Sequence, residues 1–342
     1  MSSADKHHGI RLELAVEQWN LKAPFRISGH VFSQHQALVV ALHDGDLVGR
    51  GEAAGVYYRG DDVTAMVERI ERVRGAIEAG IGREELQHIL PAGGARNALD
   101  CALWDLEAKR AGCPLWRLAG LEKPGALITT FTFGAEAPAV VGAGARASDF
   151  AALKLKLCGD QDDAARVRAA RAARPEAWIG VDANQGLDRA GLERLIPVLV
   201  DAGVSLIEQP LPVGSEADLE GLDSPIAIAA DETVQTLADV AAFAGSFDVI
   251  NIKLDKCGGL TEALAMAHEA RRLGLQVMVG NMIGTSLAMA PAWLVGQQST
   301  VVDLDGPLHL TSDRTERATY RDGQIHCGDA VWGGATMTGQ GA

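Results

Sequence analysis

The sequence has few cysteines, no cluster of basic residues and no long apolar run, and each shortage excludes a class of protein. Its five cysteines are odd in number, widely spaced and free of Cys-x-x-Cys spacing. They indicate reduced thiols in a cytoplasmic protein rather than a disulfide framework or a zinc site. No run of about 18 apolar residues lacks a charge, so we expect no membrane span. The start, MSSADKHHGIRLELAVEQ, lacks the apolar stretch of a secretory signal, so we expect no export.

Positive charge is also scarce. The chain has 31 Lys and Arg residues against 45 Asp and Glu residues, which gives a formal net charge of −14 at pH 7. Because phosphate contacts supply most of the affinity of nucleic-acid binders, this balance excludes DNA and RNA as partners. What is present is a long chain of 342 residues, 47% apolar. That excludes disorder and predicts about two domains, or one large barrel with an addition.

Residues 1–125 are typical of an α+β unit. Residues 10–16 alternate in polarity, 37–42 form an apolar run, and 43–46 supply hairpin turn chemistry, so we expect a small antiparallel meander. From residue 63 to about 110 the apolar period becomes helical. Gly112 and Pro114 end this helical stretch.

The remainder predicts a barrel. Between residues 126 and 310, short β-like runs alternate with helical stretches at intervals of a little over 20 residues. The expected strands are residues 127–133, 152–157, 178–181, 205–207, 226–229, 249–254, 276–279 and 301–304. Eight such repeats imply a closed parallel sheet, here a (β/α)7β modified TIM barrel because no helix of barrel length follows the last strand. Residues 311–342 are glycine-rich and are expected to return to the first unit as a loop-rich segment.

Catalytic groups of such barrels lie at the C-terminal ends of the strands. The charged residues at those ends are Lys154, Lys156, Asp182, Glu208, Asp231, Lys253, Asp303 and Asp305. From Lys156 to Lys253 they follow at intervals of 22 to 26 residues, so each strand delivers one charge to the same rim. The rim is therefore the predicted site.

Three of these residues predict a metal. Asp182, Glu208 and Asp231 come from consecutive strands, and carboxylates converging at one depth repel one another unless a cation neutralises them. Oxygen ligands without a nearby His or Cys favour Mg²⁺ over zinc. Each acid alone could instead cap the following helix, but three at matched strand ends favour the metal site.

The lysines predict proton transfer. Lys154 and Lys156 alternate with leucines, so both point to the barrel interior, where two close ammonium groups should lower at least one pKa towards that of a general base. Lys253 points inward four strands later, directly across an eight-stranded ring. Two bases on opposite faces of a substrate, with a metal to stabilise an enediolate, are what a 1,1-proton transfer requires.

Asp303 and Asp305 form an alternating pair at the end of the eighth strand. They could be a second metal site, a clamp for a cationic ligand, or turn residues before Gly306 and Pro307. A carboxylate clamp would hold an α-ammonium group and so favours a substrate with a free amino group.

With these residues in place, the chain resembles the enolase superfamily, in its muconate-lactonizing branch, and within it the dipeptide epimerases. The motifs that carry the resemblance are Ala98-Leu-Asp-Cys-Ala-Leu-Trp-Asp-Leu106, Lys154-Leu-Lys156, Val181-Asp-Ala-Asn184, Ile207-Glu-Gln-Pro210, Ala230-Asp-Glu232, Asn251-Ile-Lys-Leu-Asp-Lys256 and Asp303-Leu-Asp305. The resemblance implies that residues 1–125 form a capping domain over the barrel. It also implies Mg²⁺-dependent epimerisation of a dipeptide at the α-carbon of its C-terminal residue.

The resemblance further assigns roles to individual residues. Lys156 and Lys253 would be the paired acid and base, with Lys154 as their electrostatic neighbour. Asp182, Glu208 and Asp231 would hold Mg²⁺. The substrate-binding residues would be Asp303, Asp305, Arg26 and Asn184.

One position departs from the family pattern. Relatives that act on Ala-Glu carry an arginine in a loop of the capping domain, where this chain has Gly29, with Arg26, His30 and Arg59 as the nearby alternatives. The preferred dipeptide therefore stays open, as does racemisation of an N-acylamino acid. Cycloisomerisation or β-elimination at the same site, Schiff-base lyase chemistry and non-catalytic binding are further alternatives. Whether the chain forms a homo-oligomer is also open.

Overall fold

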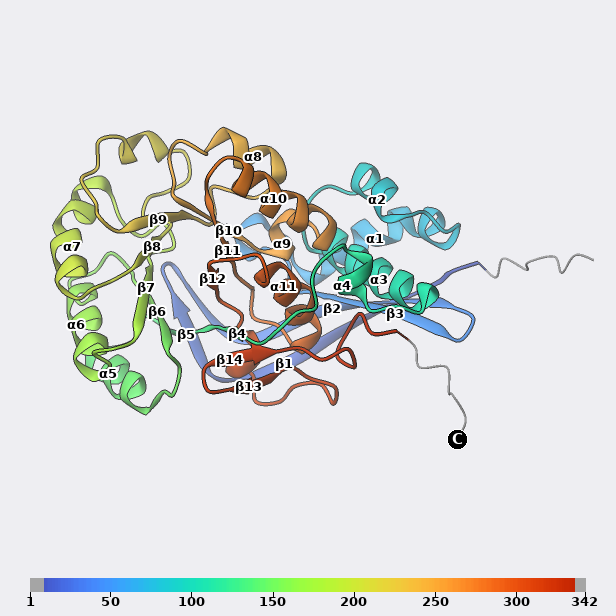
Figure 1. Ribbon diagram of the computed structural model, residues 1–342, viewed down its shortest axis with the longest axis horizontal. Helices are drawn as coiled ribbons and strands as arrows, with labels where there is room; N and C mark the ends of the chain where they lie inside the picture. Colours follow the sequence, from blue (N-terminus) through green and yellow to red (C-terminus); the bar gives the residue numbers. More distant parts are fainter. Residues whose placement is uncertain (1–8, 336–342) are drawn as a thin grey trace, which may run out of the picture.

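The computed structural model describes residues 9–335 and begins with a three-stranded antiparallel sheet (Figure 1). Its strands are β1 (Arg11–Ile27), β2 (His30–Asp44) and β3 (Leu47–Ala53). The helices that follow are α1 (Val63–Glu78), α2 (Arg83–Ile89), α3 (Gly94–Ala111) and α4 (Leu115–Leu118). Helix α3 packs directly on β3, because Gly49 and Gly51 leave no Cβ to collide with the backbone of that helix.

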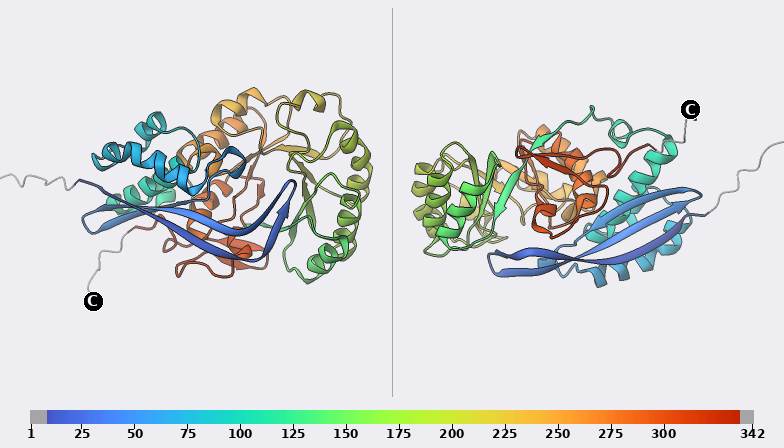
Figure 2. Two further views of the ribbon diagram at one scale, coloured as in Figure 1. Left: turned by 180° about the vertical axis from the view of Figure 1, so that it is seen from behind. Right: turned by 90° about the horizontal axis from the view of Figure 1, so that it is seen from below.

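The β1–β2 hairpin is far longer than the predicted meander. β3 pairs with β2 only between Leu38 and Asp44, so the distal part of the hairpin continues alone as a two-stranded arm, with Gly29 in its tip at φ +70°. Figure 2 shows this arm reaching along the molecule to the edge of the barrel near β5 and β6. There the backbone N–H of Ala135 donates to the carbonyl of Arg26 (3.1 Å).

The barrel sheet has eight parallel strands in chain order, which confirms the predicted architecture. They are β5 (Thr130–Phe133), β6 (Ala152–Lys156), β7 (Trp178–Asp182), β8 (Leu206–Glu208), β9 (Ala227–Ala230), β10 (Val249–Ile252), β11 (Gln276–Val279) and β12 (Val301–Val302). The two end strands, β5 and β12, are joined through side chains. Thr129 Oγ1 accepts from the N–H of Leu304 (2.9 Å), and Asp305 Oδ2 accepts from the N–H of Thr132 (2.7 Å).

Helices cover the outside of this sheet. They are α5 (Pro138–Ala147), α6 (Asp163–Ala173), α7 (Arg189–Asp201), α8 (Leu237–Ala242), α9 (Leu254–Cys257), α10 (Leu260–Arg272) and α11 (Ser286–Gly296). The segment after β8 departs from the repeat and holds only a 3-10 turn, Glu216–Leu219. Pro210, Pro212 and Gly214 in that segment disfavour a helix. No helix within residues 9–335 is long and apolar enough to cross a membrane.

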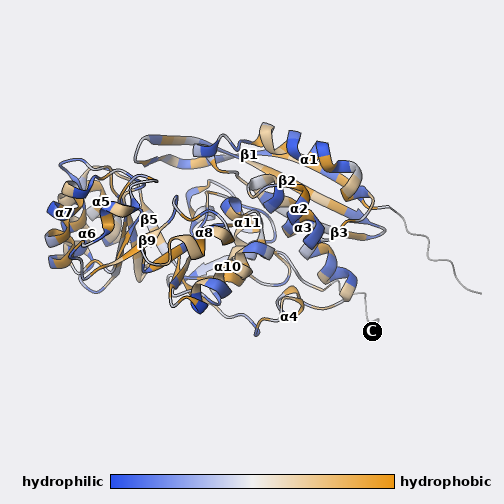
Figure 3. Cartoon of the chain, turned by 90° about the horizontal axis from the view of Figure 1, so that it is seen from above, coloured by the Kyte–Doolittle hydropathy of each residue, from blue (hydrophilic) through white to orange (hydrophobic). Residues whose placement is uncertain are grey.

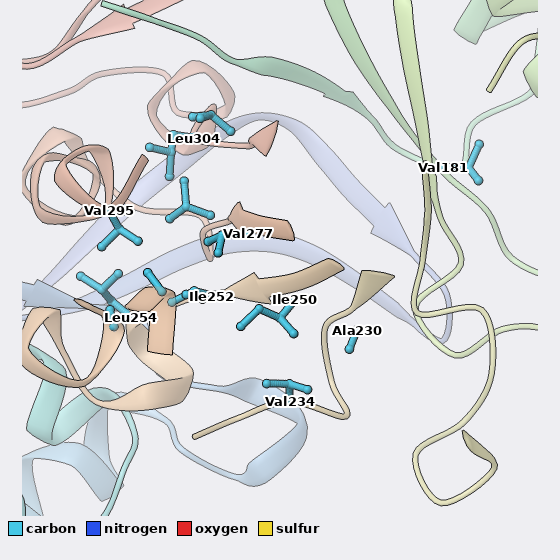
Figure 4. Close-up of a cluster of buried hydrophobic side chains, with 14 of the residues drawn as sticks. Val181, Ala230, Val234, Ile250, Ile252, Leu254, Val277, Val295 and Leu304 are labelled. Atoms are coloured by element: carbon cyan, nitrogen blue, oxygen red, sulfur yellow. The ribbon is translucent and has the colours of Figure 1, made fainter. Parts of the chain in front are cut away.

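Strand alternation decides which side chains reach the barrel interior. On β6, Leu153 and Leu155 join the apolar core, while Lys154 and Lys156 point the other way. Figure 4 shows part of that core, which includes Val181, Ile250, Ile252 and Val277. Figure 3 shows hydrophilic residues, in blue, along the outer helices such as α6 and α7. The outer face of the sheet is therefore apolar and packs in the hydrophobic core, and the inner face carries the charged groups.

The first expected barrel strand is divided in two. Leu127–Ile128 forms β4 and pairs with β14 (Gln324–His326), which also pairs with β13 (Thr319–Arg321), while β5 enters the barrel. The chain then returns to the N-terminal sheet. Arg50 Nη2 donates to the carbonyl of Val331 (2.8 Å), and Trp332 Nε1 donates to the carbonyl of Arg50 (2.8 Å).

Candidate active site

Three carboxylates converge at the C-terminal ends of adjacent strands, as the sequence predicts. Asp182 ends β7, Glu208 ends β8 and Asp231 follows β9, and the parallel register pairs Asp182 with Glu208. All three are buried, and one oxygen of each lies within 4.8 Å of the others.

The environment of Glu208 fits a hard cation. Asn251 Nδ2 donates to Glu208 Oε1 (2.7 Å), whereas the buried Oε2 has no hydrogen bond, although Lys154 Nζ lies 2.6 Å from it. Burial and, next, the charge of Asp182 raise the pKa of Glu208 to about 7. A nearby divalent cation would favour the ionised form of all three acids, and three carboxylate oxygens are a donor set that suits Mg²⁺.

Lysines lie on both sides of this triad. Lys156, from β6, donates to Asp182 Oδ2 (2.6 Å), and Lys253, which follows β10, donates to Asp231 Oδ2 (2.6 Å). β6 and β10 are four positions apart in the eight-stranded sheet. Lys154, on β6 two residues before Lys156, contacts Glu208 (2.6 Å), Asp182 (3.1 Å) and Asp303 (2.8 Å). The arrangement places one amine at each flank of a shared anionic centre.

The lowered pKa expected for at least one of Lys154 and Lys156 is not found at Lys154. Burial favours the neutral amine of Lys154, but Asp303, Glu208 and Asp182 outweigh it and raise its pKa well above the usual value. For Lys253, Asp231 and Glu208 likewise outweigh burial and raise the pKa. The spacing of Lys154 and Lys156 in the sequence shows that the two ammonium groups repel each other. It does not show that carboxylates from other strands lie in contact with Lys154.

Asn184 lies beside Lys156, as its place in the motif suggests. Its Oδ1 accepts from Lys156 Nζ (2.9 Å), and its Nδ2 donates to Glu232 Oε1 (3.1 Å). Glu232 is buried, and its other carboxylate oxygen has no partner. Asn184 thus orients Lys156 and is itself held by Glu232, a residue that the sequence marked only as part of a motif.

Lys256 is a buried lysine, and the sequence analysis did not predict its contact with Asp231. Its ammonium donates to Asp231 Oδ1 (2.7 Å) and to the carbonyls of Val234 and Asn251 (2.9 Å each). Lys253 and Lys256 outweigh burial and hold the pKa of Asp231 well below its usual value. The sequence signal that could have indicated this contact is the position of Lys256, three residues after Lys253 in the same motif.

Asp303 and Asp305 lie at the β12 end of the site and line the same cavity. Asp303 accepts from Lys154 (2.8 Å) and from the hydroxyl of Thr132 (3.2 Å). Asp305 lies 3.1 Å from His309 Nε2. Burial would raise the pKa of Asp305, but His309 and hydrogen bonds from Thr132 lower it to about 2. The pair therefore presents negative charge at this end.

A cavity of about 460 Å³ lies over these residues, and side chains from the arm of the β1–β2 hairpin help to line it. Phe25 and Ile27 line it, whereas Arg26, between them on the strand, is exposed and does not. The predicted contact of Arg26 with substrate is therefore not seen, because alternation on β1 turns its side chain to the opposite face. Of the other two candidates, His30 lines the cavity and Arg59 does not.

Asp255 positions the segment that carries two tyrosines of the cavity, Tyr57 and Tyr58. It follows Lys253 in α9, and its Oδ1 accepts from the N–H groups of Ala54 (3.0 Å) and Gly55 (2.9 Å). Burial, together with the charge of Asp61, raises the pKa of Asp255 to about 7.

This raised pKa predicts a pH-dependent stability. Since the folded chain retains the proton of Asp255 between its ordinary pKa of 3.8 and about 7, the free energy of unfolding should fall as pH rises through that window. Asp255→Asn stays neutral and can still accept both N–H groups. It should therefore be more stable than the native chain at pH 8, by an amount on the order of a few kcal/mol because one pKa unit is ~1.4 kcal/mol, and about equal to it near pH 4.

Urea unfolding across this pH range checks the prediction. Asp46→Asn, in an exposed turn, is the matched control and should leave the pH dependence unchanged. A constant difference between Asp255→Asn and the native chain at all pH values would contradict the assignment.

Two family models match this chain. The model described as "Mandelate racemase / muconate lactonizing enzyme, N-terminal domain" matches residues 10–120, and the model described as "Enolase C-terminal domain-like" matches residues 135–337. The chain belongs to the enolase superfamily. The resemblance in the motifs is thereby confirmed at the level of the family.

Characterised relatives of this enolase-superfamily chain include isomerases. The chain is 39% identical over 313 residues to the L-Ala-D/L-Glu epimerase of Escherichia coli K12, covering 91% of this chain and 97% of the relative. It is 43% identical over 254 residues to the N-acetyl-D-glutamate racemase of a Pseudoalteromonas species, covering 73% and 80%.

A solved structure is also similar. The dipeptide epimerase of Methylococcus capsulatus, complexed with Mg and the dipeptide L-Arg-D-Lys, superimposes with a TM-score of 0.87 at 32% identity, covering 94% of this chain and 97% of that one.

Proposed function

We propose that the chain is a Mg²⁺-dependent dipeptide epimerase, an isomerase that inverts the α-carbon of the C-terminal residue. The observation that carries this proposal is the placement of Lys156 and Lys253 on opposite flanks of one carboxylate triad. Inversion requires removal of a proton from one face of a carbon and its return to the other face, and two amines so placed can do both. The epimerase and the Mg- and dipeptide-bound structure among the relatives support the same reaction.

In the proposed reaction, a neutral amine of one lysine takes the α-proton and becomes an ammonium. The ammonium of the opposite lysine then donates a proton to the other face of the planar anion and becomes neutral. The number of protons on the pair is unchanged, and the configuration is inverted. Asn184 keeps Lys156 directed at the reacting carbon through its hydrogen bond to the lysine (2.9 Å).

Asp182, Glu208 and Asp231 would hold the Mg²⁺. When bound, the metal supplies positive charge that stabilises the carboxylate of the substrate as the α-proton leaves. Lys154 contacts two of these acids and would add to that positive charge. Burial of all four groups strengthens their interactions, because the local dielectric is low.

Asp303 and Asp305 would bind the α-ammonium group of the dipeptide. Asp303 already holds Lys154, so its loss would disturb the lysines as well, and Asp305 is the cleaner position to test. An Asp305→Asn side chain can still accept from the N–H of Thr132 but carries no charge. We expect kcat/KM for a dipeptide to fall about 10- to 100-fold, because a hydrogen bond to a charged group contributes ~1.5–3 kcal/mol.

The control is the N-acetyl derivative of the same C-terminal amino acid, which has no ammonium group. Its rate should fall less than that of the dipeptide in Asp305→Asn. Equal losses for the two substrates would contradict an ammonium site. They would favour the second candidate function, racemisation of N-acylamino acids, which the racemase among the relatives supports.

Incubation of L-Ala-L-Xaa dipeptides with the protein and Mg²⁺ in deuterated water tests the main proposal. Epimerisation predicts deuterium at the α-carbon of the C-terminal residue and accumulation of the L,D-dipeptide, detected by mass spectrometry and chiral chromatography. Loss of water or formation of a new ring would instead indicate elimination or cycloisomerisation.

We further propose the division of the chain into a capping domain (residues 1–125), a barrel (126–310) and a returning segment (311–342). The contacts of Arg50 with Val331 and Trp332 support the return, and residues 1–8 and 336–342 lie outside the described structure. We also propose a cytoplasmic location, supported by the free thiols of all five cysteines.

A further inference from the structure

Four of the ten phenylalanine and tyrosine residues of the chain line the cavity over the triad. Phe32 on β2 and Tyr57 meet edge to face, with ring centroids 5.1 Å apart, and Tyr57 meets Tyr58 in the same way at 5.1 Å. His30 packs against Phe32 (4.3 Å) and Tyr57 (5.0 Å). We call His30, Phe32, Tyr57 and Tyr58 the aromatic wall.

The aromatic wall has apolar surface left to bury. Tyr57 and Tyr58 are each 37% exposed, although both line a concave site. Further apolar side chains line the same cavity, namely Ile27, Met282 and Ile283. Contact with an apolar group would remove this surface from water, which is favourable in proportion to its area.

Among its described lining residues, the cavity offers no unpaired lysine or arginine to an acidic ligand side chain. Among the described residues that line it, the lysine and arginine side chains are those of Lys154, Lys156 and Lys253, and each already contacts a carboxylate. Asp62 and Glu232 also line the cavity and form no ion pair among the described residues, whereas Asp61 is paired with Arg69. A glutamate side chain would thus meet repulsion without a compensating ion pair.

The geometry of the proposed reaction directs the substrate side chain toward this wall. Once the α-proton leaves, the α-carbon is trigonal, and its three remaining substituents point in three directions within one plane. The carboxylate faces the triad, and the amide nitrogen leads to Asp303 and Asp305 at the β12 end. The side chain takes the remaining direction, away from β12.

The aromatic wall lies on that side of the site. The hydroxyl of Tyr58 accepts from Gln235 Nε2 (3.0 Å), and Gln235 Nε2 also donates to the carbonyl of Glu232, next to Asp231 (2.7 Å). Tyr57 packs on Tyr58 and lines the cavity together with Glu232. Glu232 follows β9, three strands away from β12.

We infer that the substrate carries an uncharged, apolar or aromatic side chain on its C-terminal residue, with L-Ala-L-Phe and L-Ala-L-Leu as representatives, rather than an acidic one. This inference rests on the proposed epimerase function. It also separates this chain from the L-Ala-D/L-Glu epimerase to which it is similar.

The test compares kcat/KM for L-Ala-L-Phe, L-Ala-L-Leu, L-Ala-L-Lys and L-Ala-L-Glu by α-proton exchange in deuterated water. We expect the two apolar dipeptides to exceed L-Ala-L-Glu and L-Ala-L-Lys by at least about tenfold, the size of a modest gain in apolar contact. Phe32→Ala and Tyr57→Ala should each lower kcat/KM for L-Ala-L-Phe about tenfold, and that for L-Ala-L-Ala by less. Val16→Ala, an exposed position on the same hairpin and outside the cavity, is the control and should change neither.

Each outcome decides the matter. A faster reaction with L-Ala-L-Glu or L-Ala-L-Lys would overturn the inference and leave the epimerase function intact. Equal losses for L-Ala-L-Phe and L-Ala-L-Ala in both wall variants would also overturn it. Absence of exchange with every dipeptide would overturn the proposed function itself, and the inference with it. Calorimetric binding of L-Ala-L-Phe and L-Ala-L-Glu gives a second readout and should show the same order.

Discussion

Replacing either Lys156 or Lys253 by methionine should lower the rate of epimerisation at least about 10³-fold, since a positioned acid or base contributes ~10²- to 10⁴-fold and inversion needs both. Methionine retains most of the length of the side chain without the amine. In Lys253→Met the triad keeps a cation, because Lys256 still contacts Asp231 Oδ1 (2.7 Å). The loss should therefore reflect the missing proton carrier.

Lys156→Met and Lys253→Met should differ in which epimer still exchanges its α-proton, because the two bases lie on opposite faces of the substrate. Each should still exchange the α-proton of one epimer with deuterium, and the two variants should retain opposite epimers. Proton NMR of each pure epimer in deuterated water measures this. Lys22→Met, an exposed lysine on β1, is the control and should leave both exchange and inversion unchanged. Full turnover in both active-site variants would show that the assignment of the bases is wrong.

Removal of the metal should lower the rate of epimerisation about as much as the loss of either lysine. Chelation by EDTA is expected to abolish epimerisation, and added Mg²⁺ should restore it. In the native chain, Mg²⁺ at about 100 times its dissociation constant should stabilise the fold by ~2.7 kcal/mol, which corresponds to an increase of several degrees in Tm. Glu208→Gln should lose both the activity and this increase, because it removes the charge of an oxygen ligand.

The thermal shift separates metal binding from catalysis. Glu193→Gln, on the exposed face of α7, serves as the control and should keep the full increase in Tm. A normal Mg²⁺-dependent increase in Glu208→Gln would mean that the ion binds elsewhere.

The sequence predicted the barrel and the strand-end residues because their signals are local. Alternation within β6 shows that Lys154 and Lys156 share a face, and the parallel connection fixes which end of each strand meets the rim. The triad followed from these two rules. All eight barrel strands lie within a few residues of their expected places, except that residues 127–133 divide between two sheets.

The features that were not predicted depend on contacts between distant segments. The distal part of β2, residues 30–36, shows no apolar alternation. The length of the hairpin was therefore not predicted, although β1 does alternate through Trp19, Leu21 and Phe25. The outward direction of Arg26 depends on the register of that hairpin. The raised pKa values of Lys154 and Lys253 depend on carboxylates from other strands, such as Asp303, 149 residues from Lys154. A pattern of neighbouring residues cannot predict contacts between residues so far apart in the sequence.

The junction between β5 and β12 has a consequence for how the barrel can evolve. Asp303 and Asp305 bond Thr132 on β5, so the two carboxylates proposed to bind the ligand also close the ring at its seam. A substitution that changes the ligand at this end therefore also weakens the contact between β5 and β12, which are not paired as strands. Faster hydrogen exchange at the amides of Thr132 and Leu304 would show that such a substitution has weakened this contact. Selection for a new ligand at this end would therefore also have to preserve the closure of the barrel.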